Sequence, residues 1–519
     1  MRSRLAALLC LVLLILFLAA TVGVARAQAL DFNRTDYSTG NLPSGVAVAD
    51  FNRDGRPDLA TANHGYGYGI SVLLGSGGGA FSARTDFTAD AGPYAVASGD
   101  VNNDGRLDLV TANDQIAELG DLLGGSVSVL LGNGGGGFGA RTDFATGAGA
   151  CDVAVADFNG DGRPDVATAN GAEGDSSSDV PDNSVSVLLG NGAGGFATPV
   201  GFTTGANPRA LAVGDFNKDG KLDLVTANGG TWSLIGNTVS VLLGNGSGGF
   251  ARTDFATGSF PVAVAVGDLN KDAKPDLVTA NEGSGTVSVL LGNGSGGFAP
   301  KVDYAMGSSS FSPRSVAVAD LTGDANPDVA TSNNRRDQQS GYVDDYSGIL
   351  VRVGNGNGTL AGGAALGGTY GFATGKAPYE LVATDLNGDG RQDLVTANWH
   401  SHNVSVLLQQ GVQPPSSCRV TLMLSGVRKG VLKFRRAFTA KGKVTSTNLT
   451  ATKARLTLQR KKGTKWVKVK IVSRTLSATK TYTWKYKPTR KGTYRIRVTV
   501  AQTATNKAAV TKWKTFKVR

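Results

Sequence analysis

The stretch that decides the fold is Asp157-Phe158-Asn159-Gly160-Asp161-Gly162-Arg163-Pro164-Asp165. It places oxygen-bearing side chains at positions 1, 3, 5 and 9 of a nine-residue loop, with glycine at position 6. An oxygen-rich loop with a sharp turn suits Ca²⁺, a hard cation that takes about six to eight oxygen ligands. The pattern recurs seven times along the chain. The copies start at Asp50, Asp100, Asp157, Asp215, Asp268, Asp320 and Asp385.

One full repeat runs from residue 138 to residue 196, and its apolar runs are short. We predict strands at Phe138–Phe144, Val153–Ala156, Val166–Ala169 and Val185–Leu189, followed by a Gly-rich turn. Short β-branched runs bounded by Gly and Asn are typical of strands and hairpins. A repeat of roughly 50 to 65 residues with four strands is typical of a propeller blade. The sequence therefore predicts an all-β fold, with a seven-bladed β-propeller over residues 28–411.

The two ends of the repeat array complement each other. The last unit ends at Val404–Leu408 and lacks the Phe-containing strand that follows the other units. A matching strand, Phe32–Tyr37, precedes the first unit. Pairing these two strands would close a ring and remove an open sheet edge. An open solenoid is the alternative, and it would not need this offset.

The Phe-Gly strand, the short connection, the alanine-rich strand and the Asp-x-Asn-x-Asp-Gly-x-x-Asp loop together resemble the FG-GAP/VCBS repeat. That repeat also forms the seven-bladed propeller of integrin α subunits. The resemblance covers about Leu30 to Gly411. It implies the propeller fold and calcium as the cofactor, but it implies little about function, because one fold serves many functions.

The resemblance and the oxygen geometry both imply that positions 1, 3, 5 and 9 supply side-chain ligands, and that position 7 supplies its main-chain carbonyl. The predicted side-chain ligands are Asp50, Asn52, Asp54, Asp58, Asp100, Asn102, Asp104, Asp108, Asp157, Asn159, Asp161, Asp165, Asp215, Asn217, Asp219, Asp223, Asp268, Asn270, Asp272, Asp276, Asp320, Thr322, Asp324, Asp328, Asp385, Asn387, Asp389 and Asp393. The predicted carbonyl ligands are Arg56, Arg106, Arg163, Lys221, Lys274, Asn326 and Arg391. The alternative for any loop is an Asx-turn without metal.

Two of the seven loops depart from the pattern. Ala273 and Ala325 replace glycine at position 6, and Thr322 replaces asparagine at position 3. If position 6 needs a positive φ, alanine costs on the order of 1 kcal/mol there. We therefore expect the loops that start at Asp268 and Asp320 to hold calcium most weakly.

Strand alternation puts the Asp-rich loops and the Gly-Asn-Gly turns at one face of the ring, and the loops of variable length at the other. Aromatic and histidine side chains collect in these variable loops, where they suit sugar or peptide binding. The candidate ligand-binding residues are Tyr66, Tyr68, Trp232, Tyr342, Tyr346, Trp399, His400 and His402. The alternative is that these side chains cap the ends of the blades. His400 and His402 could also hold a metal together with a third ligand.

The N-terminal segment, residues 1–27, has the pattern of a secretory signal peptide. An apolar run over Leu5–Ala20 follows a charged start, and Ala25-Arg26-Ala27 forms a small-x-small cleavage site. An uncleaved membrane anchor is the alternative. We expect a secreted or cell-wall-associated protein without a transmembrane span in the mature chain. Cys151 and Cys418 would remain in it, either as two thiols or as one disulfide.

Charge divides the chain into two parts. From residue 414 onward there are 29 Lys and Arg and no Asp or Glu, so the preceding part holds the other 23 basic residues and all 41 acidic ones. After a polar linker at residues 412–418, runs with period-two alternation such as Thr493–Val500 predict a small antiparallel β-sandwich over residues 419–519. This part resembles the immunoglobulin-like modules that end many secreted bacterial proteins.

So lopsided a surface predicts a polyanionic partner for the C-terminal part. An anionic cell-wall polymer, such as teichoic acid or an anionic polysaccharide, comes first for a secreted protein. Nucleic acid comes second, since a basic patch does not choose between phosphates. The alternative is that the charge serves solubility alone.

Two functions remain open from the sequence. The first is a secreted, monomeric, calcium-stabilised propeller that binds a glycan or protein ligand and has no catalytic residues. The second is a polysaccharide lyase or hydrolase, for which His400, His402 and Lys376 are the nearest candidates. The chain has no Gly-x-Ser-x-Gly, no His-Glu-x-x-His and no phosphate-binding glycine loop.

Overall fold

The structure is a computed structural model that forms two compact units, Leu30–Gln410 and a unit within Gly411–Arg519. It describes residues 30–65, 67, 69–114, 124–171, 182–231, 235–307, 311–337, 341–361, 369–410, 419–420, 422–425, 431–432, 437–445, 453–462, 464–475, 481–500, 509–510 and 514–519. These described residues form strands and one short 3-10 turn, η1 (Trp399–Ser401). None of the helical structure in this part of the chain is long and apolar enough to cross a membrane. The proposed signal peptide and Cys418 lie outside the described residues.

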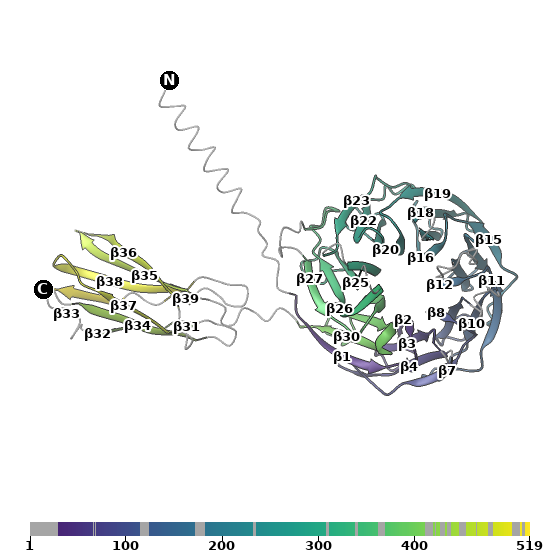
Figure 1. The fold of residues 1–519 in the computed structure, drawn as a ribbon, viewed down its shortest axis with the longest axis horizontal. Coiled ribbons are helices and arrows are strands. Elements are labelled where there is room, and N and C mark those ends of the chain that lie inside the picture. Colours follow the sequence, from purple (N-terminus) through teal and green to yellow (C-terminus); the bar gives the residue numbers. More distant parts are fainter. Residues whose placement is uncertain are drawn as a thin grey trace, which may run out of the picture. The chain divides into compact units, whose positions relative to one another are not determined.

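The unit Leu30–Gln410 contains seven four-stranded antiparallel sheets among its described residues (Figure 1). Their innermost strands are β2 (Pro43–Ala49), β8 (Pro93–Gly99), β12 (Ala150–Ala156), β16 (Pro208–Gly214), β20 (Pro261–Gly267), β24 (Phe311–Ala319) and β28 (Pro378–Thr384). The second strands are β3 (Asp58–Asn63), β9 (Asp108–Asn113), β13 (Asp165–Asn170), β17 (Asp223–Gly230), β21 (Asp276–Asn281), β25 (Asp328–Asp337) and β29 (Asp393–Asn398).

The outer half of each sheet completes the same order. The third strands are β4 (Gly69–Leu73), β10 (Gly125–Leu130), β14 (Ser184–Leu188), β18 (Ile235–Gly244), β22 (Thr286–Leu290), β26 (Gly341–Arg352) and β30 (Asn403–Gln409). The fourth strands are β7 (Thr85–Thr88), β11 (Thr142–Thr146), β15 (Val200–Thr203), β19 (Phe250–Ala256), β23 (Val302–Ala305), β27 (Thr369–Ala373) and β1 (Phe32–Ser38). A short hairpin of β5 (Gly75–Gly77) and β6 (Ala80–Phe81) precedes β7.

Each innermost strand contacts the innermost strand of the next sheet, and β28 contacts β2, so the series of sheets closes on itself. The closure uses the N-terminal strand, because β1 pairs with β30 from Phe32 opposite Gln409 to Ser38 opposite Asn403. The predicted pairing of the first strand with the last unit is therefore confirmed. Small residues such as Ala47 and Ala97 suit the innermost strands, where neighbouring sheets crowd together around the axis.

The predicted start of the fourth strand was wrong in three of the units. Phe138 forms only a single bridge with Gly132, and the strand itself begins at Thr142. Phe196 and Phe298 form the same kind of bridge before β15 and β23. The chain has to turn between the bridge and the strand. The Phe side chain therefore packs as a buried plug, and Phe138 meets Phe51 edge-on with ring centroids 5.6 Å apart.

A buried polar ladder fixes each sheet to the connection that enters it. Asn63 donates through Nδ2 to Ser71 Oγ at 3.0 Å, and Ser71 donates to Asp86 Oδ1 at 2.7 Å. The main-chain N–H of Gly40, in the preceding connection, donates to the same Ser71 oxygen at 2.9 Å. Because buried polar groups are costly unless hydrogen-bonded, this ladder holds the connection against the sheet.

The described part of the C-terminal unit contains two sheets. One contains β31 (Arg419–Val420), β32 (Met423–Ser425), β34 (Phe438–Thr445) and β37 (Thr481–Tyr486). The other contains β33 (Val431–Leu432), β35 (Lys453–Lys462), β36 (Lys465–Thr475), β38 (Gly492–Val500), β39 (Ala509–Val510) and β40 (Lys514–Val518).

The two sheets share one apolar core, to which Phe438 and Trp484 come from the first sheet and Tyr494 and Phe516 from the second. One pairing differs from the antiparallel order that we predict from the sequence, because β33 and β40 run parallel. Parallel pairing requires a long connection between the two strands, and here one strand lies near the start of the unit and the other at its end.

Candidate binding site

The Asp-rich loops lie where the sequence predicts, between the first and second strands of each sheet. In the third sheet, Asp157 Oδ2 accepts the N–H of Gly162 at 2.8 Å, and Asp161 Oδ1 accepts the N–H of Arg163 at 2.9 Å. Asp165 is fully buried and accepts from Phe158 N at 2.9 Å and from Gly190 N at 2.7 Å. The second of these bonds joins the loop to the Gly-Asn-Gly turn, so both lie at one end of the sheet.

The donor set of each loop consists of oxygens, which fits calcium in chemistry. Burial raises the pKa of Asp165 against the lowering effect of its backbone hydrogen bonds, and the charges of Asp161 and Asp157 raise it too. The carboxylates of one loop are therefore close enough to repel one another. Among the described residues, however, no three acidic, His or Cys side chains are grouped as a metal cluster. The position-5 carboxylate instead turns toward position 7, as in the 2.5 Å ion pair of Asp54 with Arg56.

Position 6 of the loop adopts a left-handed backbone in every copy. Its φ is +80° at Gly162, +61° at Ala273 and +65° at Ala325. The conformational requirement inferred from the sequence is thus confirmed, and the two alanine loops carry the strain. The weaker calcium binding that we expect of these loops stays a prediction.

The opposite face holds the candidate ligand-binding residues only in part. Tyr66, Tyr68 and Trp232 lie outside the described residues, as do the side chains of Tyr342 and Tyr346 on β26.

Three candidates are described, and they gather at η1. Trp399 is half-buried, His400 is exposed, and His402 accepts the N–H of Leu42 through Nδ1 at 2.9 Å. The main-chain N–H of His400 donates to Lys376 O at 3.2 Å. His402 thus braces the neighbouring connection.

Trp399 belongs to an aromatic cluster at this face. Its ring stacks on Tyr379 with centroids 4.8 Å apart, and it lies 5.2 Å from His64 and 6.5 Å from Tyr94. His64 Nε2 lies 3.1 Å from Oδ2 of the buried Asp114. The cluster joins the variable loops to the innermost strands, because Tyr94 is on β8 and Tyr379 is on β28.

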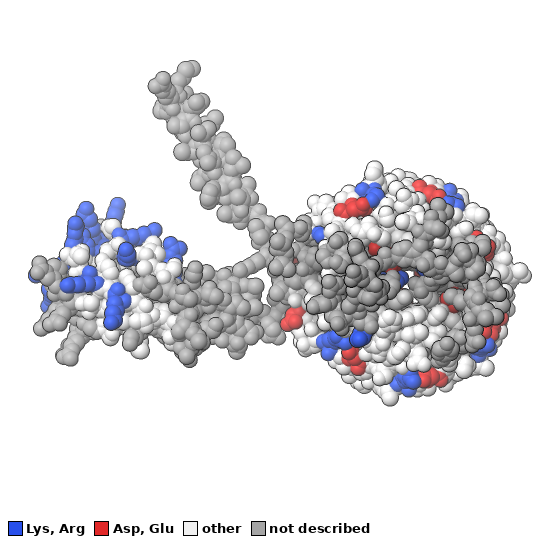
Figure 2. Space-filling view, viewed as in Figure 1, with Lys and Arg blue, Asp and Glu red and all other residues white. Residues whose placement is uncertain are grey.

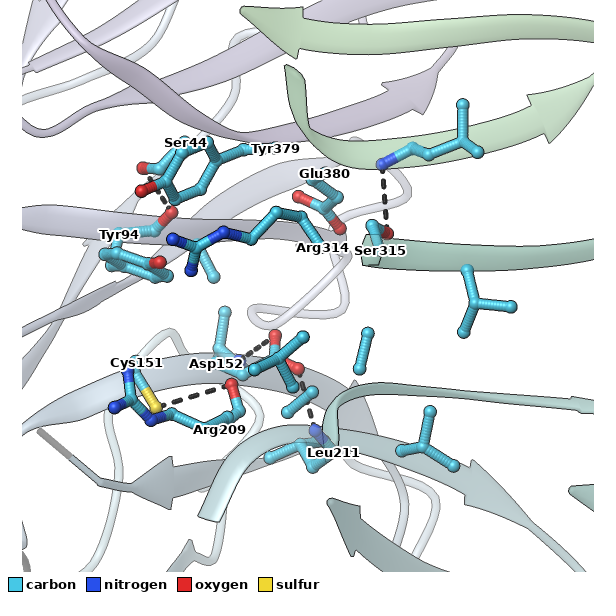
Figure 3. A pocket seen from close by; sticks show the side chains of 18 residues that line it. Ser44, Tyr94, Cys151, Asp152, Arg209, Leu211, Arg314, Ser315, Tyr379 and Glu380 are labelled. Atoms are coloured by element: carbon cyan, nitrogen blue, oxygen red, sulfur yellow. Dashed lines mark hydrogen bonds between the residues drawn. The ribbon is translucent and has the colours of Figure 1, made fainter. Parts of the chain in front are cut away.

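A pocket of about 270 Å³ lies between the innermost strands, at the end opposite to the Asp-rich loops (Figure 3). The residue six places before each loop aspartate lines its outer level, namely Ser44, Tyr94, Cys151, Arg209, Val262, Arg314 and Tyr379. The next residue along the chain lines the inner level, namely Ala95, Asp152, Ala210, Ala263, Ser315 and Glu380, with Gly45 at the same place in the first repeat. Apolar side chains, including Val153, Leu211 and Leu381, form the floor.

The polar residues of the inner level link neighbouring sheets. Glu380 Oε2 accepts the N–H of Val46 at 2.7 Å, and Asp152 Oδ2 accepts the N–H of Leu211 at 2.8 Å. Ser315 Oγ accepts the N–H of Leu381 at 3.1 Å in the same way. In each case the donor belongs to the next sheet around the ring. These side chains therefore have a structural role in addition to any contact with a ligand.

The two carboxyl groups are held in different protonation states. Burial raises the pKa of Glu380 to about 8, with a further increase from the charge of Asp152. Burial also raises the pKa of Asp152, to about 6, against the lowering effect of hydrogen bonds from Leu211 and Val153. Near pH 7, Glu380 is thus mostly protonated and Asp152 mostly ionised. Figure 3 shows the two side chains on facing walls of the pocket.

Two guanidinium groups belong to the outer level. Arg314 forms an ion pair with the buried Glu282 at 3.3 Å and lies over the Tyr379 ring, 5.1 Å from its centroid. Arg209 lies over the Phe260 ring at 5.5 Å. In Figure 3 Arg314 extends between Tyr379 and Tyr94. The outer level therefore combines cationic and aromatic groups above a level that holds the carboxyl groups.

Comparison with known proteins agrees with the repeated loops. A family model described as an FG-GAP-like repeat matches residues 50–111, 116–168, 176–226 and 268–331. A second model, the FG-GAP repeat, matches residues 152–188. The chain contains FG-GAP repeats. They support an FG-GAP repeat β-propeller for the unit Leu30–Gln410, whereas neither model covers the C-terminal unit.

Solved structures add no argument beyond the FG-GAP repeats. Two listings of a fructofuranosidase from Schwanniomyces occidentalis, complexed with fructose and with fructosyl-erythritol, are each 8% identical to the chain with a TM-score of 0.30. The alignments cover 94% of both chains in the first case and 96% of both in the second. So low a TM-score carries no conclusion about this fold or its function. A search of curated proteins finds no match.

The pocket was missed in the sequence because the FG-GAP repeats were compared for what they share. Alignment on the loop aspartates gives Gly45, Ala95, Asp152, Ala210, Ala263, Ser315 and Glu380 at one position. Five of these seven are small residues, and the two acids stand out among them. A search for the inner-strand positions at which the repeats differ would have found both carboxyl groups.

Proposed function

We propose that the protein is a secreted, seven-bladed FG-GAP propeller that acts as a monomeric binding or adhesion module, with its ligand seated in the axial pocket. The observation that carries this proposal is the set of unlike side chains around the pocket. The repeats are nearly identical at the Asp-rich loops, yet their outer pocket level contains Ser, Tyr, Cys, Arg and Val. Unlike side chains converging on one concavity are typical of a ligand site.

Calcium has a bracing role in this proposal. Positions 1, 3, 5 and 9 of each loop would hold the ion together with the carbonyl of position 7, as Asp157, Asn159, Asp161, Asp165 and Arg163 do in the third repeat. A bound cation supplies positive charge that relieves the repulsion among the loop carboxylates. Sevenfold repetition argues for a structural role of these loops and against a single active element.

The C-terminal unit supplies the tether in our proposal, as an immunoglobulin-like β-sandwich bound to an anionic cell-wall polymer. Figure 2 shows Lys and Arg side chains, and no acidic ones, over its described strands. Arg495 lies over the Trp466 ring with its guanidinium carbon 4.4 Å from the centroid. This pair and the neighbouring Lys461, Lys468 and Arg497 suit phosphate or carboxylate groups along a polymer.

The tether is tested by deletion of residues 414–519, which removes the basic unit and leaves the ring. The intact protein should sediment with isolated Gram-positive cell walls, and the shortened protein should stay in solution. Extraction of teichoic acid from the walls should release the intact protein as well. Equal sedimentation of both forms would refute the tether, and retention on immobilised DNA but not on walls would favour the nucleic-acid partner.

The pocket is tested by probing the intact protein and a Tyr379→Ala, Arg314→Ala double variant on arrays of glycans and of extracellular proteins. A binding module of this kind should give signals that the double variant loses. Asp254→Asn, on the outer strand β19, serves as the matched control. Signals that survive unchanged in the double variant would place the binding surface elsewhere and contradict the proposal.

One observation favours a second candidate function, a hydrolase acting on a polysaccharide. Glu380 and Asp152 differ in protonation near pH 7, as a general acid and its partner carboxylate must. Turnover of a polysaccharide by the intact protein, abolished in Glu380→Gln and retained in His400→Ala, would support it. Binding without turnover by a folded protein would leave the binding module as the function.

A further inference from the structure

We propose that the axial pocket binds a single neutral sugar residue, whose hydroxyl groups contact Asp152 and Glu380. This inference rests on the proposed binding function and specifies its ligand. The sugar would be the terminal residue of a glycan, since the pocket is closed below by the Val153, Leu211 and Leu381 side chains. Its volume of about 270 Å³ lies just under the ~300–1,000 Å³ of sites for drug-sized ligands. A ligand portion of one ring therefore suits it.

Charge balance favours a neutral ligand over an ion. Two carboxyl groups and two guanidinium groups line the same pocket, and the buried Glu282 pairs with one of these guanidinium groups. A cation would meet Arg209 and Arg314 at the outer level. An anion would meet Asp152 and Glu380 at the inner level. A neutral polar ligand avoids both repulsions.

The walls offer donors and acceptors in alternation, as a polyol requires. Each innermost strand is the edge of its sheet, so one row of its N–H and C=O groups points away from the sheet toward the axis. Small residues at Gly45, Ala95, Ala210 and Ala263 leave this backbone uncovered. A sugar hydroxyl both donates and accepts, and can therefore pair with such an edge at either kind of group.

Glu380 is the side chain best placed to read a hydroxyl group. Its Oε2 is taken by Val46 N, whereas its other oxygen has no hydrogen-bond partner among the residues that the structure describes. A carboxyl group held by one backbone bond is fixed in position and still has one oxygen for a ligand. Asp152 faces it, so that hydroxyl groups on both sides of one sugar ring would meet a carboxyl group.

The aromatic cluster forms one side of the mouth. Tyr379 lies between Trp399 and Arg314, and Tyr94 stands at its edge with centroids 6.4 Å apart. These rings are held in place by one another. The apolar C–H face of a sugar would pack against the outer edge of this rigid wall, while its hydroxyl groups point to the carboxyl groups below.

The test is titration calorimetry and saturation-transfer NMR on the intact protein with calcium present. The probes are glucose, galactose, mannose, rhamnose, fucose and N-acetylglucosamine, each up to millimolar concentration. At least one should bind. Glu380→Gln and Asp152→Asn should each weaken that binding roughly tenfold or more, because each replaces a charge-assisted or donor contact. Both amides keep an oxygen for the backbone N–H and should remain folded.

A variant that fills the pocket gives independent evidence. Ala263→Gln adds bulk at the inner level without removing any of the three links between sheets, and it should abolish sugar binding. Asp254→Asn should leave binding unchanged. Unaltered sugar affinity in the filled variant would overturn the proposal, as would the absence of binding by all six sugars.

Two parallel probe sets separate this inference from the function on which it rests. Galacturonic acid represents anions, and lysine represents cations. Binding of either, with loss in Ala263→Gln, would overturn the neutral-sugar ligand while keeping the pocket as a binding site. No pocket-dependent binding of any probe or array ligand would overturn both.

Discussion

The two ends of each innermost strand obey different rules. At one end every strand runs into an Asp-rich loop, and the seven loops are almost interchangeable. At the other end the seven strands present unlike side chains to the axis. Both ends belong to the same strand, and the difference between them separates what holds the ring together from what gives it one identity.

Physical constraints explain the uniform end. The last aspartate of each loop, such as Asp165, is fully buried and accepts backbone N–H groups from both its own loop and the neighbouring turn. A sheet that lost this side chain would bury N–H groups without acceptors. The pocket end has no such requirement, because its side chains point to the axis, where side chains of many kinds fit.

Removal of calcium should have the largest effect on this comparison, since it acts on the loop end alone. Calcium at about ten times its Kd adds ~1.4 kcal/mol per site, so the five complete loops together would add ~7 kcal/mol. Differential scanning calorimetry with calcium and with a chelator should show a large fall in Tm. Restored calcium should reverse it. An unchanged midpoint would refute the metal sites and leave the loops as Asx-turns.

Asp165→Ala should cost about 3–5 kcal/mol of unfolding free energy, because it leaves the N–H groups of Phe158 and Gly190 without their acceptor. Urea denaturation in the presence of chelator measures this cost without any contribution from metal. Asp161→Ala is the control within the same loop, since that side chain is largely solvent-exposed, and it should cost less than about 1 kcal/mol. Equal losses in the two variants would contradict the role assigned to the buried aspartate.

Glu380→Gln should change how stability depends on pH. The pKa of Glu380 is raised from 4.5 to about 8, so the folded state holds a proton that the unfolded state releases. Wild-type stability should therefore fall as pH rises from about 4.5 to about 8, by on the order of 2–4 kcal/mol. The variant should lack this part of the slope in urea melts across that range. Parallel curves for the two proteins would show that Glu380 is not buried as described.

Substitutions at position 6 should have opposite signs in different loops. Ala273→Gly and Ala325→Gly should each stabilise the fold by about 1 kcal/mol, because they relieve a left-handed alanine. Gly162→Ala should destabilise it by a similar amount. Gly201→Ala serves as the control, because a Cβ there meets no atom within 4 Å and the backbone is not left-handed. Thermal melts that rank these four variants differently would contradict the conformational argument.

The smallest effect is expected at the pocket end. Ala263→Ser introduces the residue that the next repeat carries as Ser315, and stability should change by less than about 0.5 kcal/mol. The new hydroxyl group would have Val316 N as its nearest counterpart of the bond from Leu381 to Ser315. A loss above about 1 kcal/mol would show that the pocket end is constrained as tightly as the loop end.

Sequence reasoning reached the features that repetition makes visible. The strand order, the shared face of loop and turn, the pairing of β1 with β30 and the left-handed position 6 all follow from patterns that recur or from one missing piece. It failed at Phe138, because a single bridge and a strand have the same apolar pattern. It also passed over Asp152 and Glu380, because a residue that occurs in one repeat only does not stand out when repeats are compared for likeness.

The candidate aromatic residues show another limit. Trp399 was singled out for being aromatic and in a variable loop, yet its partners Tyr379 and Tyr94 lie on innermost strands and come from other repeats. Such contacts depend on the ring closing, and local spacing holds no record of them. A loop residue could thus be found from the sequence, but its place in a cluster could not.

The joining of β1 to β30 has a consequence for biosynthesis. Residue 32 finds its partner only when residue 409 is available, so a nascent chain cannot complete the ring until almost the whole propeller has been made. Before that point the third strand of the last sheet would be an uncovered edge, open to pairing with other chains. A polypeptide that crosses a membrane unfolded and folds afterwards would meet both of its ends in the same compartment at the same time.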